Sequence, residues 1–227
     1  KFPGHTEFLA QIANTQDYIM LMVSETMKVG VVTTHLPISK ITENITTESI
    51  LSKIRIIAKS LQQDFAVTRP RIAVFGLNPH AGDNGLLGNE EKEIILPAII
   101  QAKKEGIIAL GPYPADGFFG TEDYRKFDAI LAMYHDQGLI PFKLASFDRG
   151  VNYTAGLPFI RTSPAHGTAY SLAGENKASP DSFRQALYLA IDIYKNRQLY
   201  AEITQNPLKK YDINPNQIDE SVDIESD

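Results

Sequence analysis

The sequence predicts an α/β fold with a largely parallel sheet flanked by helices, and three observations lead to that prediction. Short apolar runs of strand length alternate with longer segments of helical periodicity, the pattern of parallel strands joined by crossover helices. Glycine or proline follows several of these runs. Three runs are followed within one to four residues by a histidine, and ligands of open α/β sheets bind beyond the carboxyl ends of the strands.

The amino-acid composition argues against several classes of function. The 227 residues are 43% hydrophobic and 22% charged, which is ordinary for a globular protein. The chain has no cysteine, so disulfides, thiolate catalysis and cysteine metal ligands are excluded. A net charge of -5 gives no electrostatic case for nucleic acid. No apolar run approaches the ~20 residues of a membrane helix, and no signal peptide is visible, so no membrane partner and a cytoplasmic location are expected.

The first part of the chain is expected to form a short helix, two strands and a long helix. The short helix covers about residues 7–14, and the strands cover residues 18–23 and 28–34. Thr46 or Thr47 is expected to cap a helix that runs to about residue 65. The apolar face of this long helix is predicted to be core, and it comprises Ile50, Leu51, Ile54, Ile57, Ala58 and Leu61.

The second part continues the alternation. Strands are expected over residues 71–76, 107–110 and 129–133, extended segments over 149–157 and 158–163, and helices over about 90–105, 164–173 and from Ser179 onward. The residues predicted to face inward on the two longer helices are Ile94, Ile95, Ala98, Ala102, Phe183, Ala186, Leu187, Ala190, Ile191 and Tyr194. Residues 77–88 and 111–120 are expected to be loops. A polar, acidic tail is expected over residues 205–227.

His35, His80 and His135 are the candidate metal ligands. If the strands before them are parallel neighbours, the three imidazoles come to one end of the sheet, as in a catalytic zinc site with three protein ligands. Without thiolates, zinc, cobalt, nickel or magnesium are all compatible with such a site. The alternative is three unrelated loop histidines, because their spacing matches no short metal-binding motif.

Other candidates carry charge or hydrogen-bonding groups near these positions. His5 and Thr6 lie at a helix start, where free N–H groups favour anions, although Thr6 can equally be an N-cap. Lys143 and Arg161 suit a phosphate or carboxylate, or are ordinary surface charges. Asp116 can orient a ligand histidine or simply form a turn. The glycines of residues 82–88 lack the G-x-G pair of dinucleotide-binding loops.

Several stretches in the same order resemble the 4-hydroxythreonine-4-phosphate dehydrogenase family of the vitamin B6 pathway. They extend from the start of the chain to about Lys195 and are far more specific together than any one motif. The matching stretches are Phe2-Pro3-Gly4-His5-Thr6-Glu7, Thr33-Thr34-His35-Leu36-Pro37, Gly76-Leu77-Asn78-Pro79-His80-Ala81-Gly82, Pro114-Ala115-Asp116, Ala132-Met133-Tyr134-His135-Asp136-Gln137-Gly138, Arg149-Gly150-Val151-Asn152, Gly156-Leu157-Pro158-Phe159-Ile160-Arg161-Thr162-Ser163 and His166-Gly167-Thr168-Ala169.

The resemblance implies a homodimeric α/β enzyme similar to isocitrate and isopropylmalate dehydrogenases, which also lack the dinucleotide fingerprint. By match to the family's motifs, the metal ligands are His35, His80 and His135, in a site shared between subunits. The substrate-binding positions are His5, Thr6, Lys143, Asn152 and Arg161. Residues 1–204 are then expected to be the C-terminal part of a two-domain dehydrogenase whose N-terminal part, over a hundred residues, is absent from this sequence.

The expected reaction is oxidation of 4-phosphohydroxy-L-threonine to 2-amino-3-oxo-4-phosphooxybutanoate, followed by decarboxylation, with a divalent metal (zinc, cobalt or magnesium) and NAD or NADP. Asp116 and Asp136 are candidates to orient the histidines. Three alternatives remain at this stage. They are the same chemistry on D-threonate or D-erythronate 4-phosphate, a non-catalytic module that binds metal and phosphorylated ligands, and a metallohydrolase.

Overall fold

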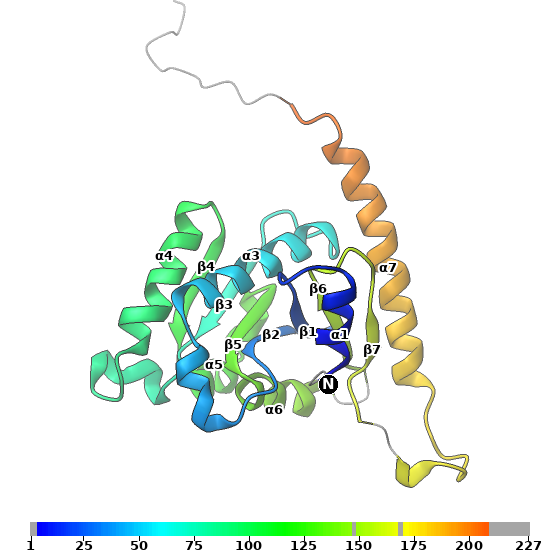
Figure 1. The fold of residues 1–227 in the computed structure, drawn as a ribbon, viewed down its shortest axis with the longest axis horizontal. Helices are drawn as coiled ribbons and strands as arrows, with labels where there is room; N and C mark the ends of the chain where they lie inside the picture. The colour runs from blue at the N-terminus through cyan, green and yellow to red at the C-terminus, as the bar shows by residue number, and fades with distance from the viewer. Residues whose placement is uncertain (1–3, 147–148, 168–169, 209–227) are drawn as a thin grey trace, which may run out of the picture.

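The computed structural model describes residues 4–146, 149–167 and 170–208, and it confirms the predicted α/β fold (Figure 1). A seven-stranded sheet has the order β4-β3-β5-β2-β1-β6-β7, with helices on both faces. The strands are β1 Ile19–Val23, β2 Lys28–Thr33, β3 Arg71–Phe75, β4 Ile108–Tyr113, β5 Ala129–Tyr134, β6 Val151–Ala155 and β7 Thr162–Pro164.

The sheet has a parallel part and an antiparallel part. β4, β3, β5 and β2 are parallel neighbours, whereas β1 is antiparallel to both β2 and β6, and β7 is antiparallel to β6. β6 therefore runs in the same direction as the four parallel strands. The strands buried on both faces, such as β5, are continuous apolar runs, which is typical of parallel sheets covered by helices.

Seven α-helices and five shorter helical segments surround this sheet in the described residues. The α-helices are α1 His5–Ile12, α2 Ile41–Asn44, α3 Thr47–Gln63, α4 Leu96–Lys104, α5 Ala115–Gly120, α6 His135–Ser146 and α7 Asp181–Thr204. The shorter segments are η1 Ile38–Lys40, η2 Pro79–Gly85, the π-helical turn η3 Glu91–Ile95, η4 Asp123–Lys126 and η5 Tyr170–Leu172. Among the described residues, no helix is long and apolar enough to cross a membrane.

Two cores lie on the two faces of the sheet. The first is formed by α3, α4 and the sheet residues that face them, and all six residues predicted for the inner face of α3 are buried in it. The second lies under α5 and α6, with Phe118, Leu139 and Phe142 as their contributions. Alternation along β1 and β6 assigns each side chain to one core, since Tyr153 belongs to the first and Met22 to the second.

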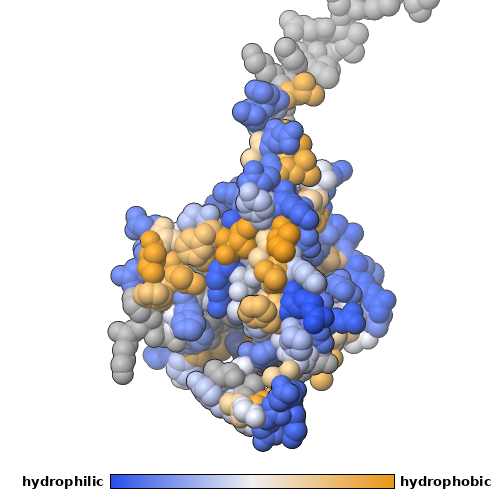
Figure 2. Space-filling model, turned by 90° about the vertical axis from the view of Figure 1, so that its right-hand side faces the viewer, coloured by the Kyte–Doolittle hydropathy of each residue, from blue (hydrophilic) through white to orange (hydrophobic). Residues whose placement is uncertain are grey.

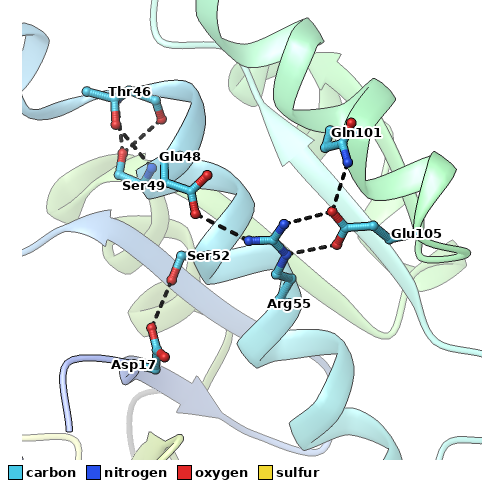
Figure 3. Close-up of polar contacts among 8 residues, drawn as sticks. All are labelled: Asp17, Thr46, Glu48, Ser49, Ser52, Arg55, Gln101 and Glu105. Carbon is cyan, nitrogen blue, oxygen red and sulfur yellow. Dashed lines mark hydrogen bonds and ion pairs between the residues drawn. The ribbon is translucent and has the colours of Figure 1, made fainter.

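The predicted cap of α3 is confirmed at Thr46. Its side chain accepts from the backbone N–H of Ser49, and the Ser49 hydroxyl in turn accepts from the N–H of Thr46, which makes a capping box (Figure 3). Further along the same helix, Arg55 donates to both carboxylate oxygens of Glu105, at the end of α4, and to Glu48. These contacts connect α3 with α4 on the outer side of the first core.

Around residue 111 the predicted strand is confirmed with a later end, whereas the loop predicted over residues 111–120 was wrong. The strand predicted over residues 107–110 extends to Tyr113, because β4 is an edge strand, where Pro112 can lack its N–H without losing a ladder bond. The segment predicted as a loop forms the short helix α5 instead, because Phe118 is buried against Phe75 at a centroid distance of 5.1 Å. The packing of aromatic side chains makes this segment helical, and no periodicity in the local sequence indicates that packing.

The end of the chain required three further corrections. Of the helix predicted over residues 164–173, the described residues 164–167 and 170–173 contain only the single turn η5, and the predicted start at Ser179 moves to Asp181. On α7, of the residues predicted to face inward, Ala186 is buried, whereas Phe183, Leu187, Ile191 and Tyr194 are exposed. Their apolar stripe faces away from the sheet because α7 packs on β6, β7 and α3 through the side that carries Ala186 and Ile193.

Parts of the predictions lie outside the described residues. These are Phe2, Pro3, Thr168 and Ala169 of the matching stretches, and residues 209–227 of the predicted tail. α7 itself ends at Thr204, next to the position where the tail was predicted to begin.

A buried carboxylate anchors α7 to the rest of the fold. Asp64 is only 1% exposed, and its oxygens accept from the hydroxyls of Ser60 and Tyr153, both at 2.6 Å, and from Nε of Arg197 at 2.7 Å. Burial, together with the neighbouring Asp64 carboxylate, raises the pKa of Tyr153, so its hydroxyl remains a donor. The network joins the end of α3, strand β6 and helix α7.

Arg197→Met is expected to lower the free energy of unfolding by about 3–5 kcal/mol, because it leaves the Asp64 carboxylate buried without a cation. Tyr153→Phe removes one neutral donor and is expected to cost about 1–3 kcal/mol. Urea denaturation followed by circular dichroism measures both. Lys195→Met, an exposed position on the same helix, is the control. Equal midpoints for Arg197→Met and Lys195→Met would show that the network does not anchor α7.

The pairing of Arg55 with Glu105 predicts a pH dependence of stability. The guanidinium holds the pKa of Glu105 at about 2, below its unfolded value, so the stabilisation is present above the unfolded pKa and is lost as pH falls toward 2. The difference in urea midpoint between the wild type and Glu105→Gln should therefore be constant above about pH 5 and shrink to zero near pH 2. Glu93→Gln, at an exposed position, should show no such trend.

Candidate functional site

The three histidine-bearing segments leave the sheet at the same edge. β5 lies between β3 and β2 and is parallel to both, with Val74 paired with Leu131 and Thr33 paired with Tyr134. The condition on which the predicted convergence depended, that these strands are parallel neighbours, is therefore confirmed. His35 follows the pair Thr33–Tyr134 by two residues on one strand, and His135 follows it directly on the other.

His35 lies against helix α1. Its side chain is half exposed, and its Nδ1 is 2.8 Å from Oε1 of Glu7. A carboxylate only accepts hydrogen bonds, so this contact places the ring proton on Nδ1 and leaves the lone pair of Nε2 available as a metal ligand. Glu7 was not among the residues singled out from the sequence, because 28 positions separate it from His35 and nothing local couples the two.

His135 is the first residue of α6 and has the same kind of partner. Its Nδ1 is 2.7 Å from Oδ1 of Asp136, the aspartate predicted to orient it. The Asp136 side chain is 67% exposed, so water competes for this contact. Asp116, the other predicted aspartate, is exposed on α5, and no hydrogen bond joins it to a histidine in the described part of the chain.

His80 lies in a tight left-handed turn after β3. Residues 80–84 all have positive φ values, between 40° and 79°, and four of the five are not glycine. Such backbone is strained for L-residues and persists only where surrounding contacts impose it. Just before this turn, Oε1 of the buried Glu91 accepts from the backbone N–H groups of Leu77 and Asn78, both at 2.8 Å.

Gln137 joins the ends of the two neighbouring strands β3 and β5. Its side-chain amide donates to the carbonyl of Gly76 at 2.7 Å and its oxygen accepts from the N–H of Met133 at 2.7 Å. The segments that carry His80 and His135 are therefore bonded to each other through one side chain. Glu91 and Gln137 were both missed by sequence reasoning, since a buried glutamate or glutamine has no distinguishing spacing.

The donors suit a divalent metal, but one chain does not assemble them. Imidazole nitrogens with carboxylate-bound partners are the usual ligand chemistry for zinc and similar ions. Within residues 4–146, 149–167 and 170–208, however, no group of three His, Asp or Glu side chains lies close enough to hold a metal ion. The three histidines share an edge of the sheet without closing into a site.

One of the predicted substrate residues, Thr6, lies close to a predicted metal ligand. His5 begins α1, where Gly4 and not Thr6 is the N-cap, so the N-cap interpretation of Thr6 was wrong. Thr6 lines a small cavity of about 130 Å³ together with Glu7, Tyr18 and His35. α1 thus brings one predicted substrate residue and one predicted metal ligand to a shared cavity.

The remaining three predicted substrate residues come from α6 and from the antiparallel part of the sheet. Lys143 is half-buried on α6, the helix that begins with His135. Asn152 pairs with Met22 on the same face, and its Oδ1 is buried without a hydrogen-bond partner in the part of the chain that the structure describes. Arg161 donates to Thr154 at 3.4 Å, and burial lowers its pKa. An unpartnered amide oxygen and a partly desolvated guanidinium are groups that a polar ligand can satisfy.

A larger cavity, of about 890 Å³, lies elsewhere. It is bounded by α3, residues 156–158 and α7, and none of the ten predicted site residues lines it. Its cations are largely paired, since Arg55 contacts Glu48 and Glu105, and Arg197 contacts Asp64. The candidate site is therefore the carboxyl edge of β3, β5 and β2, not this cavity.

Comparison with known proteins gives consistent results. The family model described as "Pyridoxal phosphate biosynthetic protein PdxA" matches residues 1–190. A protein named 4-hydroxythreonine-4-phosphate dehydrogenase from Bacteroides thetaiotaomicron is 55% identical over 92% of the chain, and one from Aquifex aeolicus is 51% identical over 85%. The chain spans 58% and 59% of the lengths of these two relatives.

Solved structures agree in fold. The crystal structure of 4-hydroxythreonine-4-phosphate dehydrogenase from Klebsiella pneumoniae matches 85% of the chain with a TM-score of 0.76 and 43% identity, and the chain covers 58% of it. A terephthalate 1,2-cis-dihydrodiol dehydrogenase from Burkholderia xenovorans matches 83% of the chain with a TM-score of 0.69 and 26% identity. The same architecture therefore occurs in dehydrogenases named for different substrates.

Glu91→Leu is expected to lower the free energy of unfolding by about 2–4 kcal/mol, because the backbone N–H groups of Leu77 and Asn78 lose their buried acceptor. Glu91→Gln keeps an oxygen in that position and should retain most of the stability. Chemical denaturation measures both variants, with Glu93→Leu, an exposed neighbour, as the control. If Glu91→Leu and Glu93→Leu unfold at the same urea concentration, the bonds of Glu91 to the segment before the left-handed turn do not stabilise the fold.

Proposed function

The chain belongs to the family of the pyridoxal phosphate biosynthetic protein PdxA, and from this membership we propose that it is the C-terminal part of a 4-hydroxythreonine-4-phosphate dehydrogenase. The proposed activity is the NAD- or NADP-linked oxidation of 4-phosphohydroxy-L-threonine to 2-amino-3-oxo-4-phosphooxybutanoate, with subsequent decarboxylation. One observation from the structure supports the proposal in addition to the family membership. β2 and β5 are parallel neighbours whose ends present His35 and His135, each with Nδ1 held by a carboxylate.

His35, His80 and His135 would hold the divalent metal, whether zinc, cobalt or magnesium. When bound, the ion supplies Lewis acidity at the secondary hydroxyl of the substrate and at the carbonyl that replaces it. The chain's own contribution is to keep Nδ1 of His35 and His135 protonated and their Nε2 atoms free. Asp136 would orient His135, and Asp116 remains a candidate for the same task only on its match to the family.

Cationic and polar side chains would hold the substrate. Lys143 and Arg161 would bind its phosphate or carboxylate, and the partial burial of Arg161 strengthens such a contact by excluding water. His5, Thr6 and Asn152 would fix the pose, with the unpartnered Oδ1 of Asn152 accepting from a hydroxyl or ammonium group. The substrate would thus be held from α1, α6 and β6 around the metal.

A homodimer with a shared metal site fits the same observations. A single chain does not bring three metal-binding side chains together in its described residues, so a second copy would complete the site. Ile140 and Leu144, on the helix that begins with His135, are 58% and 84% exposed. Apolar side chains also gather on the face that carries α7 (Figure 2). Exposed apolar patches of this kind are typical of protein–protein contacts.

Two other readings of the same site have support. The relative named for a terephthalate dihydrodiol shows that this fold is used with other substrates, so D-threonate or D-erythronate 4-phosphate is the nearest alternative. The second alternative is a module that binds metal and phosphorylated ligands without turnover. Binding of metal and substrate without reduction of NAD or NADP distinguishes the binding module.

The activity test uses the chain as it stands and the chain preceded by the N-terminal part of the Bacteroides thetaiotaomicron relative. Reduction of NAD or NADP with 4-phosphohydroxy-L-threonine is measured spectrophotometrically, with and without chelator. Activity that chelator abolishes and added metal restores is expected in the extended chain. His35→Ala should lower kcat by at least about a hundredfold, whereas the exposed Lys40→Ala should not change it.

Each negative outcome has a separate meaning. Turnover of D-threonate or D-erythronate 4-phosphate alone would replace the substrate and keep the chemistry. A His35→Ala protein that binds metal and turns over normally would overturn the proposed metal ligands. Loss of all turnover with retained metal and substrate binding would favour the binding module.

A further inference from the structure

Glu7 connects the proposed substrate helix to a proposed metal ligand. Its Oε1 lies 2.8 Å from Nδ1 of His35, and its side chain is 20% exposed where that of His35 is 49% exposed. Among the described residues, His35 is the only side chain to which the Glu7 carboxylate is bonded. Glu7 follows His5 and Thr6 on the first turn of α1, so one carboxylate links all three proposed site residues.

The surroundings of Glu7 are shaped for this contact. The second carboxylate oxygen, Oε2, is buried and has no hydrogen-bond partner among the described residues. A Cβ placed on Gly4 would lie 2.7 Å from that oxygen and 3.0 Å from Cε1 of His35, so a larger residue at this position would press on the pair. A buried oxygen without a partner is unfavourable. The first oxygen keeps its bond to His35 in this pose.

The pair of His135 and Asp136 shows by contrast what is unusual about Glu7. Asp136 is adjacent to its histidine in the sequence and 67% exposed, so its contact competes with water and fastens no second element. Glu7 is less exposed and comes from another element. Its bond therefore fixes both the ring of His35 and the position of α1 relative to the end of β2.

We propose that Glu7 is a positioning residue that holds His35 with Nε2 directed at the metal and keeps His5 and Thr6 at a set distance from it. The inference rests on the proposed function, because it requires His35 to be a ligand. Carboxylates that accept from the second nitrogen of a ligand histidine fix its tautomer and orientation, and their loss typically weakens metal affinity ten- to a hundredfold.

Glu7→Gln and Glu7→Ala in the extended chain test this inference. Metal affinity is measured by competition with a chromophoric chelator, and the visible absorption of the cobalt-loaded protein reports the ligand geometry. Glu7→Ala is expected to weaken cobalt affinity about 10- to 100-fold and to change the spectrum. Glu7→Gln keeps an acceptor oxygen without its charge, so its affinity should fall between those of Glu7→Ala and the wild type. Gln11→Ala, exposed on the same helix, is the control.

The outcomes separate this inference from the function on which it rests. Cobalt affinity and spectrum that are unchanged in both folded Glu7 variants would overturn it, and if Glu7→Ala does not fold, a wild-type affinity and spectrum in Glu7→Gln would do so alone. If His35→Ala loses metal while the Glu7 variants do not, only the positioning role fails. If His35→Ala also keeps wild-type affinity, the proposed metal site fails as well.

Discussion

The parallel pairing of β3 and β2 on the two sides of β5 is the constraint on which the candidate site depends. Parallel strands end at the same edge, so the residues that follow them come to that edge, however far apart they lie in the sequence. The pairing is stabilised by two cores, one on each face of β5, which makes the register of these strands difficult to change. The order of the strands therefore determines where the residues of the candidate site lie.

Three carboxylates then hold helices and loops in place around this sheet. Asp64 anchors α7, Glu91 holds the segment that leads into the left-handed turn with His80, and Glu7 joins α1 to His35. In each case a carboxylate accepts from donors on a segment at least 13 positions away. Acceptor-only groups with several lone-pair directions suit this task, since one side chain can satisfy two or three donors. The site is thus built from polar contacts placed on an apolar framework.

Prediction from the sequence succeeded where the signal was local. The apolar face of α3, the cap at Thr46 and the strand before His135 all follow from periodicity or from a single turn of chain, and all were confirmed. It failed where contacts between distant elements decided the outcome. α5 forms because Phe118 packs on Phe75, and the apolar stripe of α7 is exposed because another side of that helix faces the sheet.

The sequence by itself determined the types of the long periodic elements, the absence of thiol chemistry and the set of residues able to bind a metal or an anion. Those properties depend on side-chain chemistry and on periods of two or 3.6 residues, which are visible over short windows. Only the tertiary structure decided that β5 lies between β3 and β2, that Glu7 is the partner of His35 and that no three described ligands close in one chain. These features depend on which distant segments pack together, and no local pattern encodes that choice.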